Sequence, residues 1–247
     1  SRGGNTQAGG SPAAACCLLS TRIREARHTK RAFAGRALPD PPRAPTVDVV
    51  TTMREATLHD LPGVYRVCRL TGHAGRDAPS RPADPAPLGH LWAGPYLTFP
   101  DAVTRVIQDD HGVAGYCLAV PDTITFERWL DEVWLPPLRE RHPLGSGSTP
   151  ADRALVERLH TTHRTDAVLL AEHPAHLHVD LLPRLQGQGW GRRVVDDVVG
   201  ELSRAGVPGI HLGVDPANSV APGFYERLGF MTVAGPPGAR WYGIRMA

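Results

Sequence analysis

A segment with three closely spaced glycines, Gly187, Gly189 and Gly191, constrains the fold of this chain most strongly. The residues before it, 176–182, alternate between polar and apolar side chains and predict a strand. The residues after it, 192–204, have apolar side chains at helical spacing. A helix that begins after such a turn presents unpaired N–H groups and a positive dipole end, and glycines let a ligand approach closely. The segment therefore predicts an anion site for a phosphate or a pyrophosphate.

The charge balance of the chain argues against partners that are strongly anionic. The sequence has 27 basic and 25 acidic residues, whereas a binder of nucleic acid or of an anionic membrane normally carries a basic excess. Lys30 is the only lysine, a bias typical of a GC-rich bacterial coding sequence. No apolar run approaches the ~20 residues that cross a bilayer, and no convincing signal peptide is present. We predict a cytoplasmic monomer or homodimer with no nucleic-acid and no membrane partner.

Composition divides the chain into two parts. Residues 1–46 are rich in Gly, Ala, Arg and Pro and predict a low-complexity tail with little core, with one short helix near 22–33. Residues 47–247 predict one folded domain. The four cysteines are too few and too irregularly spaced for a disulfide framework or a zinc site.

The folded part predicts one mixed α/β domain. Residues 103–120 predict an antiparallel hairpin whose turn is 109–112. Pro136 and Pro137 predict the end of a helix that begins at Thr125. The predicted strands are 49–54, 103–108, 113–120, 167–170, 177–182, 209–214, 230–233 and 241–246, and the predicted helices are 57–70, 88–97, 125–135, 149–160, 192–205 and 222–228.

Two common glycine-rich motifs do not fit the turn. A dinucleotide-binding fingerprint would lie in the first strand–helix–strand unit, whereas this turn lies late in the chain. A Walker A loop needs Lys followed by Ser or Thr after its last glycine, and here Arg192 and Arg193 follow Gly191.

Two motifs at family spacing resemble those of the GNAT (GCN5-related N-acetyltransferase) superfamily. The pattern of Gln186, Gly189 and Gly191 looks like its acetyl-CoA motif. A second signature begins at Asn218 and continues with Ala221, Phe224, Tyr225, Gly229 and Phe230. Residues 64–68, 112–119 and 134–142 more closely resemble the acetyltransferase-like C-terminal domain of O-GlcNAcases and its bacterial relatives. The animal domain has a degraded cofactor loop, whereas this chain keeps its glycines.

The resemblance implies a fold and an activity. The fold is a GNAT α/β (α+β) domain, with a central mixed, mostly antiparallel twisted sheet of about seven strands flanked by helices, and with a helical insertion around 121–165. The activity is that of an acyltransferase, in which an amine of an unidentified small molecule or protein attacks its cosubstrate acetyl-CoA directly in a ternary complex. The alternative is an acetyl-CoA-binding pseudo-acetyltransferase that senses or scaffolds without turnover.

The resemblance also assigns roles to residues. Backbone N–H groups at 186–192 would hold the pyrophosphate, a backbone N–H of Leu181 or Leu182 would bond the thioester oxygen, and Tyr225 would protonate the departing thiolate. The predicted cofactor-binding residues are Leu181, Leu182, Gln186, Gly187, Gln188, Gly189, Trp190, Gly191, Arg192, Asn218 and Tyr225.

We expect the general base among three polar side chains on the strand that precedes the glycine turn. His176, His178 and Asp180 are spaced by two and therefore point to one face of the strand. Three alternatives remain: His176 lies at a solvent-exposed strand end, the row is a hydrogen-bonded core network, or it is a metal triad, although GNAT chemistry needs no metal. Asp180 is the first choice, so the predicted catalytic residues are Tyr225, Asp180 and His178, with no metal ligand.

Overall fold

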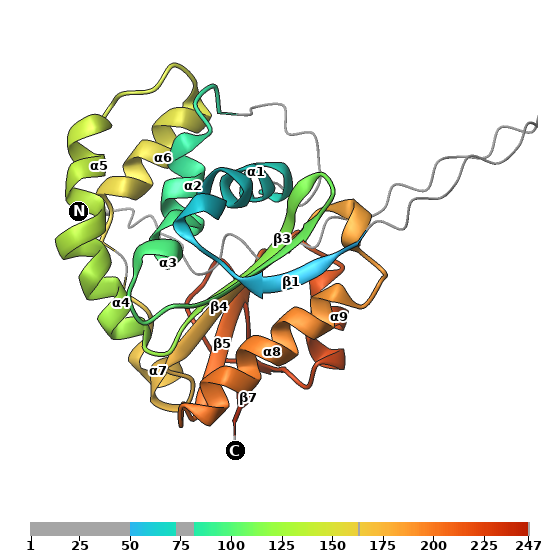
Figure 1. Ribbon diagram of the computed structural model, residues 1–247. Helices are drawn as coiled ribbons and strands as arrows, with labels where there is room; N and C mark the ends of the chain where they lie inside the picture. Colours follow the sequence, from blue (N-terminus) through green and yellow to red (C-terminus); the bar gives the residue numbers. More distant parts are fainter. Residues whose placement is uncertain (1–49, 73–81, 163, 247) are drawn as a thin grey trace, which may run out of the picture.

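A seven-stranded sheet forms the centre of the computed structural model, which describes residues 50–72, 82–162 and 164–246 (Figure 1). Its strand order is β1-β2-β3-β4-β5-β7-β6, and all neighbours are antiparallel except β4 and β5. This arrangement confirms the predicted sheet. The strands are β1 Thr52–Glu55, β2 Val103–Asp109, β3 Gly112–Val120, β4 Ala175–Leu181, β5 Gly209–Val214, β6 Met231–Val233 and β7 Arg240–Arg245.

Helices cover both faces of this sheet and form a separate layer beside it (Figure 1). The layer at the left of the view contains α4 to α6, which confirms the predicted helical insertion. A π-helical segment, Leu130–Trp134, joins α4 to α5. The helices are α1 Leu61–Thr71, α2 Ala86–Trp92, α3 Gly94–Thr98, α4 Thr123–Trp129, α5 Leu135–Arg141, α6 Pro150–His160, α7 Ala167–Glu172, α8 Trp190–Arg204 and α9 Ala221–Arg227.

Two predictions about local structure are wrong. Residues 167–170, predicted as a strand, begin helix α7, because the Asp166 carboxylate accepts hydrogen bonds from the first helical N–H groups. A short apolar run fits a strand or a buried helix equally well. The second error concerns Pro136 and Pro137, which do not end the helical path. They occupy the first turn of α5, where an N–H has no intrahelical partner to lose.

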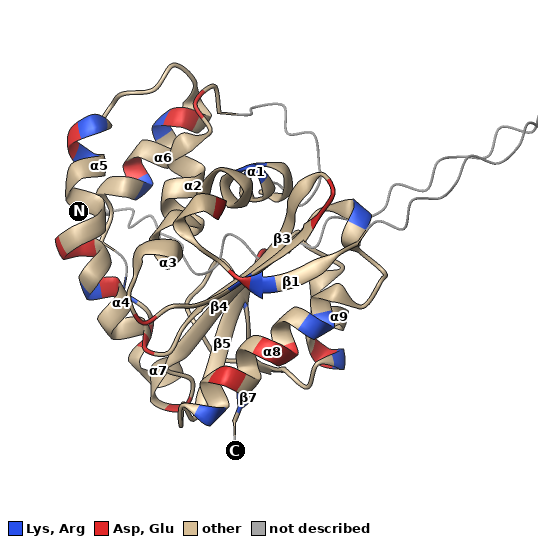
Figure 2. Ribbon diagram, in the orientation of Figure 1, with Lys and Arg blue, Asp and Glu red and all other residues tan. Residues whose placement is uncertain are grey.

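Helix α8 is fixed to the sheet by ion pairs as well as by apolar packing. Arg105 of β2 binds Asp197 at 2.7 Å and also binds Glu201, both on α8. Val194, Val195 and Val198 of the same helix are buried in the core. Figure 2 shows acidic and basic residues interspersed along the outer helices in this view. The ion pairs hold the second half of α8 on β2, and the buried valines pack its first half into the core.

Strand β4, like its neighbour β5, is enclosed along its whole length. All seven of its residues are buried. Its side chains alternate between the two faces of the sheet. Leu181 faces the start of α8, whereas His176 and His178, on the opposite face, contact the aromatic ring of Tyr96 from α3. No helix among the described residues is long and apolar enough to span a membrane. The predicted tail, residues 1–46, lies outside the described residues.

Candidate active site

The glycine turn has the backbone geometry that the sequence predicts. Gly187 and Gly189 have φ angles of 74° and 82°, in the left-handed region that favours glycine. A Cβ built on either residue would meet nothing within 4 Å, so the turn is open on that side. Gly191 is constrained differently, because its Cβ would lie 3.0 Å from the Phe224 ring. The first two glycines therefore shape the turn, and the third lets α9 pack closely on α8.

The beginning of α8 presents backbone donors next to this turn. The first intrahelical bond of the helix runs from the Arg193 N–H to the Gly189 carbonyl at 3.1 Å. The N–H groups of residues 190–192 precede this bond, so they have no intrahelical acceptor. No acidic residue lies in the first turn of the helix. This arrangement suits an anion.

Gln186 and Gln188 brace the turn by their side chains. The Gln186 amide donates to the Leu181 carbonyl at 2.9 Å, and the Gln188 amide donates to the Arg184 carbonyl at 2.6 Å. The Gln186 backbone N–H bonds the Pro183 carbonyl at 3.2 Å. The backbone donors that remain for an anion therefore begin after Gln186.

The hydrogen-bond pattern of β4 distinguishes Leu181 from Leu182. The Leu182 N–H donates to the Ala114 carbonyl of β3 at 2.8 Å, so it is already used. Alternation along an antiparallel pair then turns the Leu181 N–H away from β3 and toward β5. Strand β5 pairs with β4 only at Ala175 and His176, before Leu181 is reached. The Leu181 N–H consequently faces the gap where the two strands separate.

The polar row on β4 is buried along its whole length. His176 is 4% exposed, so the alternative that it lies at a solvent-exposed strand end is wrong. The Thr123 hydroxyl donates its one proton to the Pro174 carbonyl at 2.6 Å, so at 2.8 Å it accepts from His176 Nδ1. Burial lowers the pKa of His176 well below its ordinary value, so the ring is neutral and its Nε2 accepts from the Tyr96 hydroxyl at 2.7 Å. His176 is thus a neutral member of a directed core network.

The two candidate bases on β4 have different surroundings. Burial, together with nearby His211, lowers the pKa of His178 to about 4, which makes it neutral and weakly basic at neutral pH. Asp180 lies opposite Tyr116 of β3, whose hydroxyl donates a hydrogen bond to the Asp180 carboxylate. Among the described residues, no group of three or more His, Cys, Asp or Glu side chains is placed to hold a metal ion.

Helix α9 brings Tyr225 to the same region. Tyr225 is fully buried, with its ring edge-on to Phe224 and Phe230. The Asn218 side-chain oxygen accepts from the N–H groups of Val220 and Ala221 at 3.1 Å, so it caps the start of α9. Asn218 therefore has a structural task beside its predicted cofactor contact.

A second link joins α9 to α8. The Arg192 guanidinium donates to the Arg227 carbonyl at the end of α9, at 2.6 Å. The Trp190 ring contacts the Arg193 guanidinium, whose carbon lies 5.0 Å from the ring centre. The structure thus brings the turn, the end of β4 and α9 together. The Arg192 side chain is bonded to a protein carbonyl.

Sequence reasoning missed two residues of this region, Tyr116 and Thr123, and it considered Tyr96 only as an aromatic that could line an acceptor groove. Tyr116 is opposite Asp180 only because β3 and β4 pair in one particular register. Tyr96 and Thr123 come from α3 and from the start of α4. The hairpin was predictable, but the pairing of β3 with a strand more than fifty residues later was not.

Comparison with known proteins gives a consistent result. The family model described as the acetyltransferase (GNAT) family matches residues 78–230, more than half of the chain. The chain is 33% identical to SsHAT, whose crystal structure superposes with a TM-score of 0.67, covering 80% of this chain and 98% of that one. Rat protein O-GlcNAcase is 25% identical over 198 residues, or 78% of this chain. The chain spans only 21% of the length of that relative and of its mouse counterpart.

Proposed function

Because the chain belongs to the acetyltransferase (GNAT) family, we propose that it transfers acetyl from acetyl-CoA to a primary amine of a small molecule or protein by direct attack in a ternary complex. Membership of this family confirms the predicted acyltransferase class and acetyl-CoA as the cosubstrate. The observation that carries the proposal is the open turn at Gly187 and Gly189, beside the separation of β4 from β5.

The pyrophosphate of the cosubstrate would lie at the start of α8. The N–H groups of residues 188–192 and the dipole of a 15-residue helix both favour a negative group there. Gly187 and Gly189 expose the backbone without side chains in the way. Trp190 and Arg192 would contribute through their backbone N–H groups, since their side chains are engaged elsewhere.

The thioester oxygen would accept the Leu181 N–H. This donor faces the gap between β4 and β5, and the Leu182 N–H is bonded to Ala114. A fixed donor at the carbonyl oxygen stabilises the negative charge that develops in the tetrahedral transition state. Removing such a donor typically costs roughly 3–4 kcal/mol of barrier.

Proton transfer would complete the reaction. The acceptor ammonium loses a proton to Asp180, or to His178, and the neutral nitrogen attacks the carbonyl carbon. The C–N bond forms, the C–S bond breaks, and the CoA thiolate takes a proton from Tyr225. The attacking nitrogen then gives up its second proton, which returns the Tyr225 phenolate to its neutral form. Asp180 is the better base, because burial weakens His178 as a proton acceptor and the Tyr116 hydroxyl orients the Asp180 carboxylate.

A second function is favoured by the burial of the same residues. Asp180 and Tyr225 are both fully buried, and Asp180 is engaged by Tyr116. A chain whose proton-transfer groups stay committed to the core would bind acetyl-CoA without turnover and act as a sensor or scaffold.

Calorimetry with acetyl-CoA, followed by thiol release over a panel of primary amines, tests both functions. The enzyme should bind acetyl-CoA and release thiol with at least one amine, and D180N should lower turnover with little change in affinity. D196N, at an exposed position on α8, is the matched control. Binding without release across a broad panel favours the sensor, and a lack of binding contradicts both functions.

A further inference from the structure

The tip of the β2–β3 hairpin lies against the segment that leads into the glycine turn. The register of β2 and β3 shifts after Ile107, which leaves Ala114 of β3 without a partner on β2, as in a β-bulge. The Ala114 carbonyl accepts the Leu182 N–H at 2.8 Å. A bulge bends the strand that contains it and increases the local twist. Figure 1 shows the hairpin tip, in green, beside the orange segment that follows β4.

Asp109 and Arg184 form an ion pair across this contact. The Arg184 Nε donates to Asp109 Oδ2 at 2.5 Å, and the Arg184 Nη2 donates to Asp109 Oδ1 at 3.1 Å, so the two groups meet in bidentate geometry. The Asp109 side chain is only 4% exposed. The hydrogen bonds from Arg184 hold the pKa of the Asp109 carboxyl below its ordinary value, so the pair is charged at neutral pH.

The backbone of Arg184 is tied to the glycine turn as well. Its carbonyl accepts the Gln188 side-chain amide at 2.6 Å. Gly187 and Gly189, on either side of Gln188, are exposed and have left-handed φ angles. Glycine loses more conformational freedom than any other residue when its backbone is fixed. The turn therefore gains rigidity from Arg184, which is itself held by a nearly buried carboxylate of the hairpin.

We propose that Asp109 and Arg184 are positioning residues that hold the glycine turn in the conformation that binds the pyrophosphate of acetyl-CoA. The inference rests on the proposed function, in which backbone N–H groups of the turn contact that pyrophosphate. A turn that adopts its binding conformation for only a fraction of the time binds its ligand more weakly by that fraction. Loss of the pair therefore weakens binding although no contact with the ligand is removed.

The sign of one substitution separates positioning from a direct charge effect. If Arg184 contacted the phosphates itself, Asp109 would compete with them for the guanidinium, and D109N would strengthen binding of acetyl-CoA. If the pair positions the turn, D109N weakens binding, although it removes a negative charge near an anion site. Asp110 is exposed at the next position of the hairpin turn. D110N is therefore the matched control, because it removes the same charge and leaves the pair intact.

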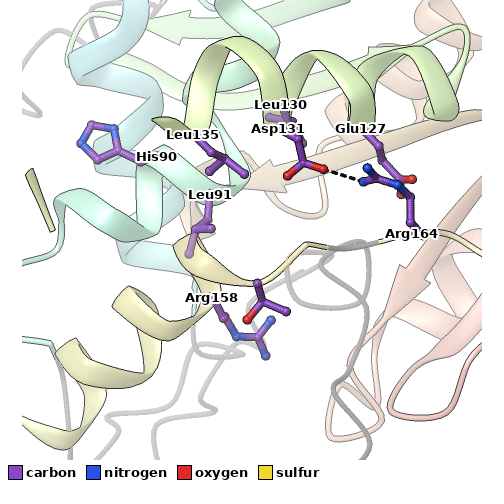
Figure 3. A pocket seen from close by; sticks show the side chains of 9 residues that line it. His90, Leu91, Glu127, Leu130, Asp131, Leu135, Arg158 and Arg164 are labelled. Atoms are coloured by element: carbon purple, nitrogen blue, oxygen red, sulfur yellow. Dashed lines mark ion pairs between the residues drawn. The ribbon is translucent and has the colours of Figure 1, made fainter. Parts of the chain in front are cut away.

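Calorimetry with acetyl-CoA on the full-length chain tests the proposal. R184Q and D109N should each raise the Kd about fivefold or more, whereas D110N should not raise it. R164Q should also leave the Kd unchanged, because it breaks the pair of Arg164 with Asp131, 2.7 Å long, in the helical layer (Figure 3). D109N/R184Q should bind no more weakly than the weaker single variant, because both changes remove one interaction.

Turnover gives a second measurement where thiol release is measurable. The KM for acetyl-CoA should rise in D109N and R184Q while kcat at saturating acetyl-CoA stays the same. A loss of folded protein would instead lower kcat at unchanged KM, and that result would overturn the proposal. Tighter or unchanged acetyl-CoA binding by D109N, or additive losses in D109N/R184Q, would overturn it as well. D109N keeps the size of the side chain and decides the question if R184Q does not fold.

Hydrogen exchange without acetyl-CoA tests the pair independently of the proposed function. The Leu185 N–H bonds the Leu182 carbonyl at 2.9 Å, and the Gln186 N–H bonds the Pro183 carbonyl at 3.2 Å, just before the turn. Both N–H groups should exchange faster in D109N than in D110N. Equal exchange rates would refute the positioning role. A failure of the unaltered chain to bind acetyl-CoA would contradict the proposed function, and the two failures are therefore distinguishable.

Discussion

Replacing Gly189 with aspartate should weaken acetyl-CoA binding without unfolding the chain. Gly189 precedes α8 with a φ of 82°, and a Cβ at this position meets nothing within 4 Å. The substitution therefore costs mainly the left-handed backbone strain, about 1 kcal/mol and less for Asp or Asn than for other residues. A negative charge at the positive end of the helix returns ~0.3–1 kcal/mol of stability. The net change in the free energy of unfolding should be small.

The effect on binding comes from charge. A carboxylate about 5 Å from the pyrophosphate, in a partly solvated site, repels each negative charge by roughly 1–3 kcal/mol. One such repulsion corresponds to about a five- to 150-fold weaker Kd. Calorimetry with acetyl-CoA should show this loss for G189D. G189N, which carries the same backbone strain and no charge, should lose much less.

Gly206 provides a matched control at the other end of α8. Its φ is 79°, and a Cβ there also meets nothing within 4 Å. G206D should therefore resemble G189D in backbone strain and bind acetyl-CoA as the unaltered chain does. The difference between G189D and G189N should shrink at high salt, because ions screen exposed charges. If G189D and G189N bind equally well, the pyrophosphate does not lie at this turn.

The remaining predictions concern three further features. Y225F should lower the rate of thiol release more than it changes the Kd for acetyl-CoA, and an unchanged rate would remove its role as the acid. N218A should destabilise the chain by about 1 kcal/mol in urea unfolding through loss of the α9 cap, whereas N218D, which keeps an acceptor oxygen, should not. Burial lowers the pKa values of His178 and His211 to about 4, below the ordinary value of 6.5. Between pH 4 and pH 6.5, the unfolded chain therefore binds more protons than the folded chain. The free energy of unfolding should be highest above pH 6.5 and should fall as the pH drops toward 4, by up to ~1.4 kcal/mol per pH unit for each histidine. Urea unfolding from pH 7.5 to 4.5 measures this slope, and H178Q should reduce it.

Elements with a strong local signal were predictable from the sequence. The 103–120 hairpin, the helix after the glycine turn and Gly229 at the end of α9 need only periodicity and turn chemistry. The strand prediction for residues 167–170 failed because a short apolar run fits a strand or a helix equally well. The hydrogen bond from Val168 to the Asp166 side chain decides for the helix. The prediction that Pro136 ends the helix failed because a π-helical segment precedes it, so that Pro136 lies in the first turn of a new helix, α5.

The candidate site was predictable where it depends on the backbone. Spaced glycines in the sequence indicate a turn with φ near +80°, and the apolar residues at helical spacing after them indicate where the helix begins. The partners of the polar row leave none: Tyr116 reaches Asp180 through register, and Tyr96 reaches His176 through the packing of α3 on the sheet. Sequence spacing placed His176, His178 and Asp180 on one face, but it does not say which of them is neutralised by burial.

The parallel pair β4–β5 explains why the site lies where it does. Every other neighbouring pair in the sheet is antiparallel, whereas β4 and β5 register only at Ala175 and His176. Because β4 keeps its ladder with β3 through Leu182, alternate N–H groups, at Val179 and Leu181, face the side where β5 diverges. A buried N–H without an acceptor costs roughly 1–3 kcal/mol, so these positions favour a ligand with carbonyl oxygens. Amide and thioester groups have that chemistry, and the start of α8 beside them suits the phosphates of the same molecule. A substitution that closed the gap between the strands should therefore weaken acetyl-CoA binding even with every glycine of the turn intact.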